Sequence, residues 1–239
     1  MDQSIFDPIP VLTEVVTGRQ AETLDITEPL VDIADYSAGL IRCSLHDDPQ
    51  DRPLGGRCYL RLAVVDRIMR AQTRLPEGLR FEVIDAWRSR AEQERIFEEY
   101  AADLRARYPD WSESQLHIRA TQFVTDPMVN APPHCTGGAV DITIRSEDGA
   151  PVWFGTAYDD FSPKASTRYY EDAVLAGERL SLKEQDAMAN RRILFNSLAQ
   201  EGLTNYPDEW WHFDYGDSFW AQVVGEPALY GVARAPDES

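Results

Sequence analysis

Two short segments with the period of a β-strand constrain the fold of this chain more than any other feature. Residues 79–85 (LRFEVID) and 138–144 (GAVDITI) send alternate side chains to opposite faces of a sheet. In the second segment Val140 and Ile142 share one face, and Asp141 lies on the other. We therefore expect a sheet that is packed on one side, with Asp141 pointing away from the apolar core.

Helical segments are interspersed with these strands. Serine-led capping patterns occur at Ser89 with Glu92, Ser112 with Gln115 and Ser181 with Glu184. With the apolar spacing after residue 59, they predict helices over residues 59–75, 89–108, 112–124 and 181–200. Short strands are expected near residues 31–36 and in the aromatic run EWWHFDY at 209–215. Because no repeating βαβ order appears, we predict a single α+β domain with helices packed on a mixed or antiparallel sheet.

The two ends of the chain differ from its middle. Residues 1–57 contain scattered Pro, Gly and Asp with little periodicity, so they are expected to form an irregular N-terminal arm that belongs to the same domain. Residues 58–230 hold the periodic segments and form the expected main unit. Residues 231–239, which end in APDES, are expected to be a disordered tail.

Charge and composition narrow the classes of partner. Acidic residues outnumber basic ones by 41 to 23, the formal net charge is -18, and no run is rich in Lys or Arg. We therefore expect neither nucleic acid nor an anionic membrane as a partner. No stretch approaches the roughly 20 apolar residues of a membrane span, and the first residues lack the pattern of a signal peptide. A cytoplasmic protein is expected, and nothing in the pattern indicates an oligomeric state.

Three cysteines, Cys43, Cys58 and Cys135, form no CxxC pair. They are expected to be free thiols in a reducing compartment. Cys135 lies beside His134 and suggests a cysteine nucleophile as a rival chemistry. We disfavour it, because a thiol adjacent in sequence to its base is rarely aimed at it.

Any histidine-based metal site must draw on four residues. His46 and His117 lie among polar residues and are expected to be ordinary surface residues. His134 lies between a Pro-Pro and a Gly-Gly pair, where the backbone can turn sharply, and Asp141 follows at the start of a strand. A catalytic zinc needs about three N or O ligands and an open position. His134, Asp141 and His212 fit that requirement, but His134 and Asp141 alone fit a structural histidine near a turn better.

Glu209 and His212 form the second candidate pair. A carboxylate beside a metal site can take a proton from water and return it. A separation of three residues sends the two side chains to opposite faces of a straight strand, so both reach one site only if the chain bends. Taken alone, the pair is explained as well by an aromatic strand with a solvated glutamate.

Together these motifs resemble the zinc signature of D-alanyl-D-alanine dipeptidases. HCTGGAVD followed by EWWHF matches the family pattern His-x-x-Gly-x-Ala-x-Asp and then Glu-Trp-Trp-His, and the similarity covers roughly residues 59–211. The resemblance implies one Zn²⁺ per chain, held by His134, Asp141 and His212. It also implies that Glu209 is the general acid/base.

Further matches imply the rest of a catalytic site. IDAWRS resembles the family's Asp-x-x-Arg, which implies that Arg88 faces the substrate carbonyl. GTAYDD resembles Gly-x-x-Phe-Asp, which implies that Asp159 meets the free ammonium group of the substrate. In the arm, Tyr36 of DYSAGL is the counterpart of a family tyrosine and an expected substrate-binding residue. The implied activity is a metalloprotease reaction in cell-wall (peptidoglycan) chemistry: zinc-dependent hydrolysis of a small dipeptide, D-Ala-D-Ala, by metal-activated water.

Departures from the family pattern leave two alternatives open. Pro132 stands where the family has a serine that helps to hold the substrate amine. This favours, as one alternative, a zinc peptidase that acts on another peptide derived from the cell wall. The other alternative is a zinc-bound binding module without turnover, and Glu209 argues against it because a structural zinc site needs no base beside an open position.

Overall fold

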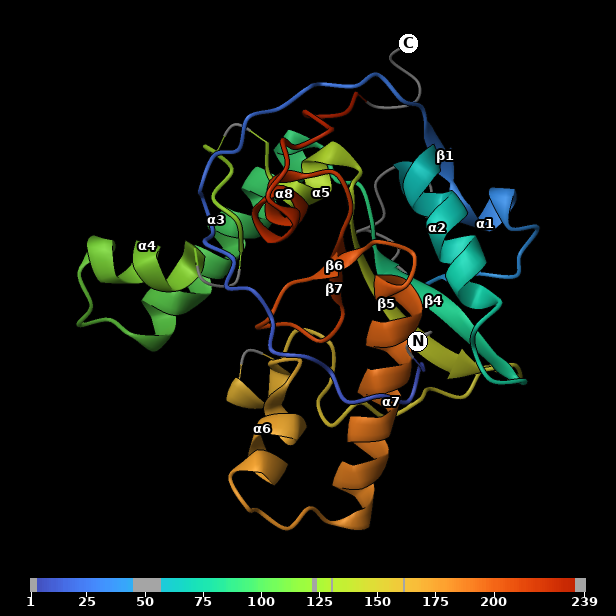
Figure 1. Ribbon diagram of the computed structural model, residues 1–239. Helices are drawn as coiled ribbons and strands as arrows, with labels where there is room; N and C mark the ends of the chain where they lie inside the picture. Colours follow the sequence, from blue (N-terminus) through green and yellow to red (C-terminus); the bar gives the residue numbers. More distant parts are fainter. Residues whose placement is uncertain (1–3, 45–56, 122–123, 130, 161, 235–239) are drawn as a thin grey trace.

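The computed structural model describes residues 4–44, 57–121, 124–129, 131–160 and 162–234 (Figure 1). Its strands are β1 (Leu30–Asp32), β2 (Arg42–Cys43), β3 (Tyr59–Arg61), β4 (Leu79–Asp85), β5 (Ala139–Ser146), β6 (Thr204–Asn205) and β7 (His212–Asp214). Its helices are α1 (Ile33–Tyr36), α2 (Leu62–Gln72), α3 (Arg90–Arg107), α4 (Glu113–Thr121), α5 (Pro133–Thr136), α6 (Tyr169–Leu175), α7 (Leu182–Ala199) and α8 (Ser218–Val224), with a short 3-10 helix, η3 (Pro163–Ala165). The predicted α+β class is confirmed.

The main sheet has five strands in the order β2-β4-β5-β7-β6. β2 runs parallel to β4 and the other neighbours are antiparallel, so the sheet is mixed, as predicted. β4 and β5 are the two segments whose alternation predicted strands. They pair from Leu79 opposite Ser146 to Asp85 opposite Asp141, with an irregularity just before Asp85. β1 and β3 form a separate antiparallel pair.

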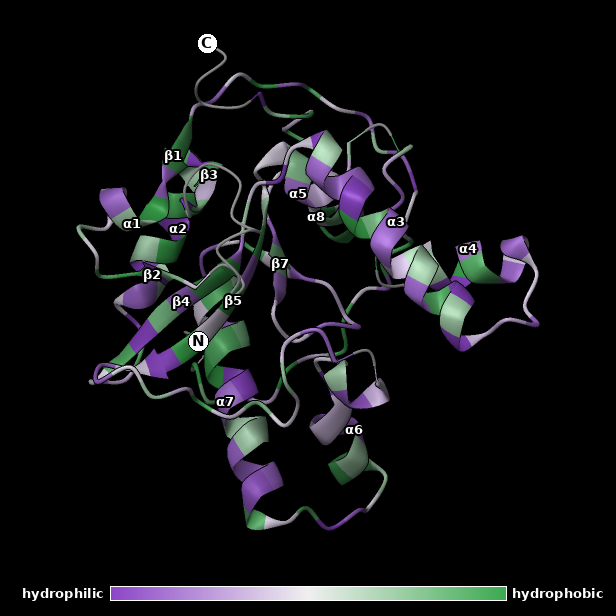
Figure 2. Cartoon of the chain, turned by 180° about the vertical axis from the view of Figure 1, so that it is seen from behind, coloured by the Kyte–Doolittle hydropathy of each residue, from purple (hydrophilic) through white to green (hydrophobic). Residues whose placement is uncertain are grey.

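The hydrophobic core covers one face of this sheet. Val140, Ile142 and Ile144 of β5 are buried in it together with apolar residues of α2 and α7. These two helices also pack against each other. The buried positions of α7 lie mainly in its C-terminal half, and Figure 2 shows the helix green where it meets the sheet. Because side chains alternate along β5, Asp141 is left on the other face.

The helices begin where the capping patterns predicted. The capping pairs are Ser181 with Glu184 at α7, Ser89 with Glu92 at α3, and Ser112 with Gln115 at α4. α3 and α4 pack against each other around a small core of their own and project from the body of the protein (Figure 1). Among the described residues, no helix combines the length and the apolar character that a membrane span requires.

The described part of the N-terminal arm lies on the surface of the domain. Ile9 is buried, and its backbone N–H donates to Glu171 at 3.2 Å. The side-chain amide of Asn196 in α7 donates to the carbonyl oxygens of Ile5 and Asp7. Figure 1 shows the arm, in blue, curving around the domain to reach β1. These contacts make the arm part of the folded unit.

Two expectations for the segments around the arm are wrong in detail. The strand expected at 31–36 stops at Asp32, because the Asp32 side chain accepts from the first backbone N–H groups of α1 and starts a helix there. The helix expected from residue 59 begins at Leu62, because residues 59–61 pair with β1.

The C-terminal segment is in contact with the domain over its described part. Ala233 is buried and its N–H donates to the carbonyl oxygen of Cys135 at 2.8 Å. The expected disordered tail therefore does not begin at residue 231, since residues 231–234 follow the folded surface. Residues 235–239 lie outside the described residues.

Ile142 lies in the middle of β5 and is 0% exposed. Shortening its side chain tests which face of the sheet packs against the hydrophobic core. Ile142→Ala should lower the free energy of unfolding by about 2–5 kcal/mol and Ile142→Val by about 0.5–1.5 kcal/mol, measured by urea denaturation. Thr143→Ala, on the opposite face of the same strand, is the matched control and should cost less than about 1 kcal/mol. Equal losses for the two alanine variants would contradict a one-sided core.

Candidate active site

Strand pairing puts Asp141 at the centre of a group of buried polar side chains. In the register of β5 with β7, Asp141 lies opposite His212, and in the register of β4 with β5 it lies opposite Asp85. Residues directly opposite each other on one face have Cβ atoms about 5 Å apart. Three side chains that are distant in sequence therefore meet on the face that the core leaves open.

His134 reaches the same place from the short helix α5. Pro133 begins this helix and Gly137 ends it with a φ of 73°, a left-handed conformation that favours glycine. Gly138 then passes so close to Tyr215 that a Cβ there would lie 2.5 Å from the Tyr215 carbonyl oxygen. The Gly-Gly pair is thus required both for the turn and for the close approach that follows it.

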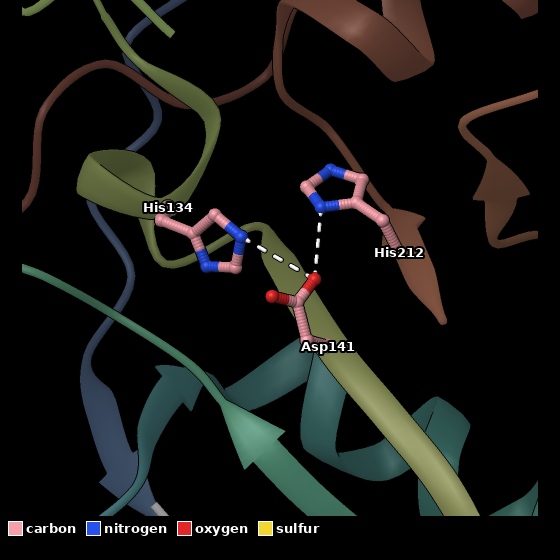
Figure 3. A group of neighbouring side chains, drawn as sticks. All are labelled: His134, Asp141 and His212. Carbon is pink, nitrogen blue, oxygen red and sulfur yellow. Dashed lines mark hydrogen bonds and ion pairs between the residues drawn. The ribbon is translucent and has the colours of Figure 1, made fainter. Parts of the chain in front are cut away.

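The two histidine rings point at the same oxygen of Asp141. His134 Nδ1 lies 2.8 Å from the carbonyl oxygen of Ala86, which can only accept, so Nδ1 carries the proton and Nε2 is free. His134 Nε2 lies 3.5 Å from Asp141 Oδ1, and His212 Nδ1 lies 2.9 Å from the same oxygen. Figure 3 shows both rings turned toward this carboxylate.

These three side chains have the arrangement of a metal ligand set. One ligand atom of each lies within 4.8 Å of the others, and all three residues are buried. Tetrahedral zinc with bonds of about 2.0–2.1 Å separates its ligand atoms by about 3.3 Å, and the distances of 2.9 and 3.5 Å to Asp141 Oδ1 bracket that value. Two imidazole nitrogens and one carboxylate also form a donor set typical of catalytic zinc. The cluster of His134, Asp141 and His212 therefore fits a zinc ion.

Glu209 and His212 reach one site because the chain turns between them. The strand expected over 209–215 is limited to β7, and the Glu209 carbonyl accepts from the His212 N–H at 3.4 Å across a turn. Glu209 Oε2 lies 3.9 Å from His212 Nδ1. The expectation of a strand that includes Glu209 is wrong, and the bend that the odd spacing required is present.

Asn205 of β6 holds this turn, and the sequence contained no signal for it. Its buried side-chain amide donates to the carbonyl oxygen of Glu209 at 3.1 Å and to that of His212 at 2.9 Å. Its own Oδ1 accepts from the Thr167 hydroxyl at 2.7 Å. Within the turn, Trp210 stacks on Phe154 with ring centroids 4.3 Å apart. The turn is thus fixed both by hydrogen bonds and by aromatic packing.

Burial and neighbouring charges set the protonation of the cluster. Burial alone would raise the pKa of Asp141, but His134 and His212 hold it well below its usual value. Burial raises the pKa of Glu209 to about 8, and His212 opposes this shift. Glu209 can therefore hold a proton near neutral pH, which suits a group that takes up and returns protons.

Arg88 lies just beyond β4 and is held by an acidic partner. Its Nε lies 3.2 Å from Asp85 Oδ2, and its backbone N–H donates to the His134 carbonyl at 3.3 Å. Burial alone would lower the pKa of Arg88, but Asp85, Tyr158 and Asp141 outweigh this effect and raise it. The guanidinium group therefore stays charged beside the cluster.

Tyr158 and Asp159 approach from the loop after β5. The Tyr158 hydroxyl donates to Asp141 Oδ2 at 2.9 Å, which leaves Oδ1 facing the histidines. The sequence analysis predicted no role for Tyr158, which only its position next to Asp159 could have suggested. Asp159 has a φ of 56°, which is uncommon for a residue other than glycine. Burial of its carboxyl group, followed by the charges of Asp141 and Asp85, raises the pKa of Asp159 to about 7.

Other candidate residues lie apart from the cluster or cannot serve in it. The Tyr36 hydroxyl donates to Asp66 at 2.6 Å and not to a residue of the cluster. Burial raises the pKa of Cys135 to about 11, so its thiol is not an activated nucleophile. All three cysteines are free thiols, as expected. His117 is a surface residue 3.5 Å from Asp126, as expected, and His46 lies outside the described residues.

A buried ligand set of two histidines and one aspartate, beside a protonatable glutamate and a charged arginine, defines a metal-dependent hydrolase. A sequence profile described as D-ala-D-ala dipeptidase, peptidase M15, matches residues 48–227. The chain belongs to this family and is a metallopeptidase.

Known proteins similar to this chain agree with that membership. A D-alanyl-D-alanine dipeptidase of Synechocystis sp. is 32% identical over 177 residues, covering 68% of this chain and 71% of that protein. A D-alanyl-D-alanine dipeptidase of Escherichia coli is 29% identical over 93 residues, covering 39% and 42%.

Solved structures with weaker similarity include two of one vancomycin-resistance enzyme. The D,D-pentapeptidase VanY in complex with Zn(II) is 16% identical with a TM-score of 0.41, covering 69% of this chain and 76% of that chain. VanYB in complex with D-alanine-D-alanine is 16% identical with a TM-score of 0.42, covering 74% and 83%.

Removal of the Asn205 side chain should loosen the turn that carries Glu209. Asn205→Ala leaves two buried carbonyl groups without their donor, so the free energy of unfolding should fall by about 1–3 kcal/mol. Peptidase kcat/KM should fall as well, because Glu209 moves relative to His212. Thr167→Val removes only the hydroxyl behind Asn205 and is the matched control. A larger loss of kcat/KM in the Thr167 variant would contradict the role given to Asn205.

Proposed function

We propose that this protein is a zinc dipeptidase that hydrolyses D-Ala-D-Ala to two molecules of D-alanine. The observation that carries the proposal is the buried His134, Asp141 and His212 cluster with Glu209 on the adjoining turn, in a chain of the D-ala-D-ala dipeptidase family. The curated relatives bear the same activity in their names. The substrate is accordingly a small free peptide.

His134 Nε2, Asp141 Oδ1 and His212 Nδ1 would hold one zinc ion per chain. Zinc bound there supplies Lewis-acid chemistry, which polarises a peptide carbonyl and makes a water molecule more acidic. The chain contributes a ligand set already gathered before metal binding, because the Ala86 carbonyl orients His134 and the Tyr158 hydroxyl orients Asp141. This preorganisation reduces the cost of ordering the ligands.

Glu209 transfers the proton that the attacking water must lose. Its carboxylate takes a proton from the attacking water and passes it to the amine of the leaving D-alanine. A pKa raised by burial to about 8 lets the same group accept and donate near neutral pH. Its distance of 3.9 Å from His212 Nδ1 keeps it beside the ligands without making it one of them.

Arg88 stabilises negative charge on the carbonyl oxygen of the scissile bond. A buried, permanently charged guanidinium group acts strongly where little water screens it. Asp85, 3.2 Å from Arg88 Nε, fixes the direction of the side chain and balances its charge in the resting protein.

Asp159 selects substrates with a free amino terminus. The left-handed backbone at Asp159, with φ of 56°, is a local strain of the kind found at functional sites. A carboxylate there pairs with the ammonium group of a dipeptide and fixes the number of residues before the scissile bond. An adjacent ammonium group also favours the ionised form of Asp159.

A second candidate substrate is another small peptide derived from the cell wall. Pro132 supports it, because the buried proline supplies no hydroxyl for the substrate amine, and its carbonyl is already used by the Cys135 N–H at 2.9 Å. The role of Tyr36 in substrate binding and a cytoplasmic location stay predictions from the sequence.

Three single variants test the mechanism. Glu209→Ala should keep zinc and lose about 10²–10⁴-fold in kcat/KM, because it removes a proton carrier and no ligand. His212→Ala should lose zinc affinity and activity together. Cys135→Ala should keep both. Zinc content is measured by metal analysis and kcat/KM by release of amino groups from D-Ala-D-Ala.

Each result has a distinct meaning. A Glu209→Ala protein that stays active with zinc bound would refute the proton-transfer role. A parent protein that binds zinc but cleaves no dipeptide in a panel of D,D-, L,D- and L,L-substrates would refute the proposed function and favour a binding module. Loss of activity in Cys135→Ala would instead support Cys135 as a cysteine nucleophile.

Acetylation of the substrate amine tests Asp159. N-acetyl-D-Ala-D-Ala should be cleaved far more slowly than the free dipeptide, because it carries no ammonium group for the carboxylate. Asp159→Ala should slow cleavage of the free dipeptide and erase most of the difference between the two substrates, measured as a ratio of kcat/KM values. Asp160→Ala, at the adjacent loop position, is the control and should keep the preference. Equal rates on both substrates in the parent enzyme would remove Asp159 from this role.

A further inference from the structure

The far side of the His212 ring faces a second buried carboxylate. His212 Nε2 lies 2.9 Å from Asp214 Oδ1, and the two residues are only 6% and 1% exposed. Both belong to β7 and are two positions apart, so they share one face of the strand. The family pattern Glu-Trp-Trp-His ends at His212 and does not include Asp214.

This contact decides which nitrogen of His212 can bind a metal. A carboxylate oxygen accepts hydrogen bonds, so the nitrogen facing Asp214 carries a proton. Nδ1 faces a carboxylate as well, that of Asp141, but it is the nitrogen that points into the ligand cluster (Figure 3). A metal-binding nitrogen must be unprotonated, so a metal bound in the cluster would replace a proton on Nδ1, while Nε2 keeps its proton toward Asp214. His134 has the opposite arrangement, because its Nδ1 is engaged by the Ala86 carbonyl and its Nε2 is free.

The two histidines also differ in the charge of the group behind them. His134 is backed by a neutral carbonyl and His212 by a carboxylate. A carboxylate behind a ligating imidazole makes the ring a stronger electron donor and resists its rotation. Since Asp214 lies on the side of the ring away from Asp141, it has no access to a substrate bound at the ligands.

We propose that Asp214 is a positioning residue of the metal site, which holds the ring of His212 with the proton on Nε2 and thereby presents Nδ1 to zinc. The inference rests on the proposed zinc site but not on the identity of the substrate. Asp214 is therefore needed for tight metal binding and takes no part in proton transfer.

Zinc affinity of two Asp214 variants tests this role. Asp214→Ala removes the acceptor and should weaken zinc binding by about 10- to 100-fold, measured by competition with a chromophoric chelator. Asp214→Asn can still offer its carbonyl oxygen to Nε2–H, so its loss should be clearly smaller than that of the alanine variant. Glu171→Gln is the matched control, because it neutralises another buried carboxylate, one that pairs with Arg192 at 2.6 Å, and should leave zinc affinity unchanged.

The tautomer itself is read by long-range ¹H–¹⁵N NMR of the zinc-loaded parent protein. The expected result is a proton on Nε2 of His212 and on Nδ1 of His134. A proton on Nδ1 of His212 would overturn the inference, as would parent-like zinc affinity in Asp214→Ala. An equal loss of affinity in Glu171→Gln would also overturn it, because general destabilisation would then explain the effect.

The outcome is separable from the test of the proposed function. If the parent protein hydrolyses D-Ala-D-Ala while Asp214→Ala keeps full zinc affinity, only the role of Asp214 fails. If zinc affinity depends on Asp214 but no dipeptide is cleaved, only the proposed function fails. Should the alanine variant not fold, the tautomer of His212 in the zinc-loaded parent protein still decides.

Discussion

The pairing of β5 with β7 is the constraint on which the rest of the site depends. It sets Asp141 directly opposite His212, and the pairing of β4 with β5 brings Asp85 and its partner Arg88 to the same region. A shift of one residue in this register would turn Asp141 toward the core and Ile142 toward the site. The apolar face of β5, packed against α2 and α7, prevents that shift, so the hydrophobic core also fixes the chemistry.

Buried charge is tolerated here because the groups at the centre of the cluster have specific partners. Asp141 faces two histidines with one oxygen and accepts from Tyr158 with the other, and His212 lies between Asp141 and Asp214. An unpaired buried charge would cost several kcal/mol. The same partners orient the free ring nitrogens and Asp141 Oδ1 toward one point. The contacts that stabilise the buried charges therefore also preorganise the metal site.

The sequence was sufficient to predict the local features of the fold and the residues of the site. Alternation along residues 79–85 and 138–144 predicted β4 and β5 and the face of Asp141, because a strand has a period of two whatever surrounds it. Ser89, Ser112 and Ser181 marked helix starts through contacts that span three residues. The motifs around His134 and Glu209 pointed to the residues of the site through a resemblance to a family, and that family is confirmed.

Tertiary structure decided what depends on contacts between distant segments. The turn at Glu209 replaced the expected strand because Asn205, on another strand, binds the carbonyl groups on either side of it. The ring nitrogens available to a metal follow from Ala86 and Asp214, and the free oxygen of Asp141 follows from Tyr158. The sequence by itself thus determined the kinds of residues and their local conformation. Their relative orientation was decided only by folding, because hydrogen bonds between segments remote in sequence leave no periodic pattern in either of them.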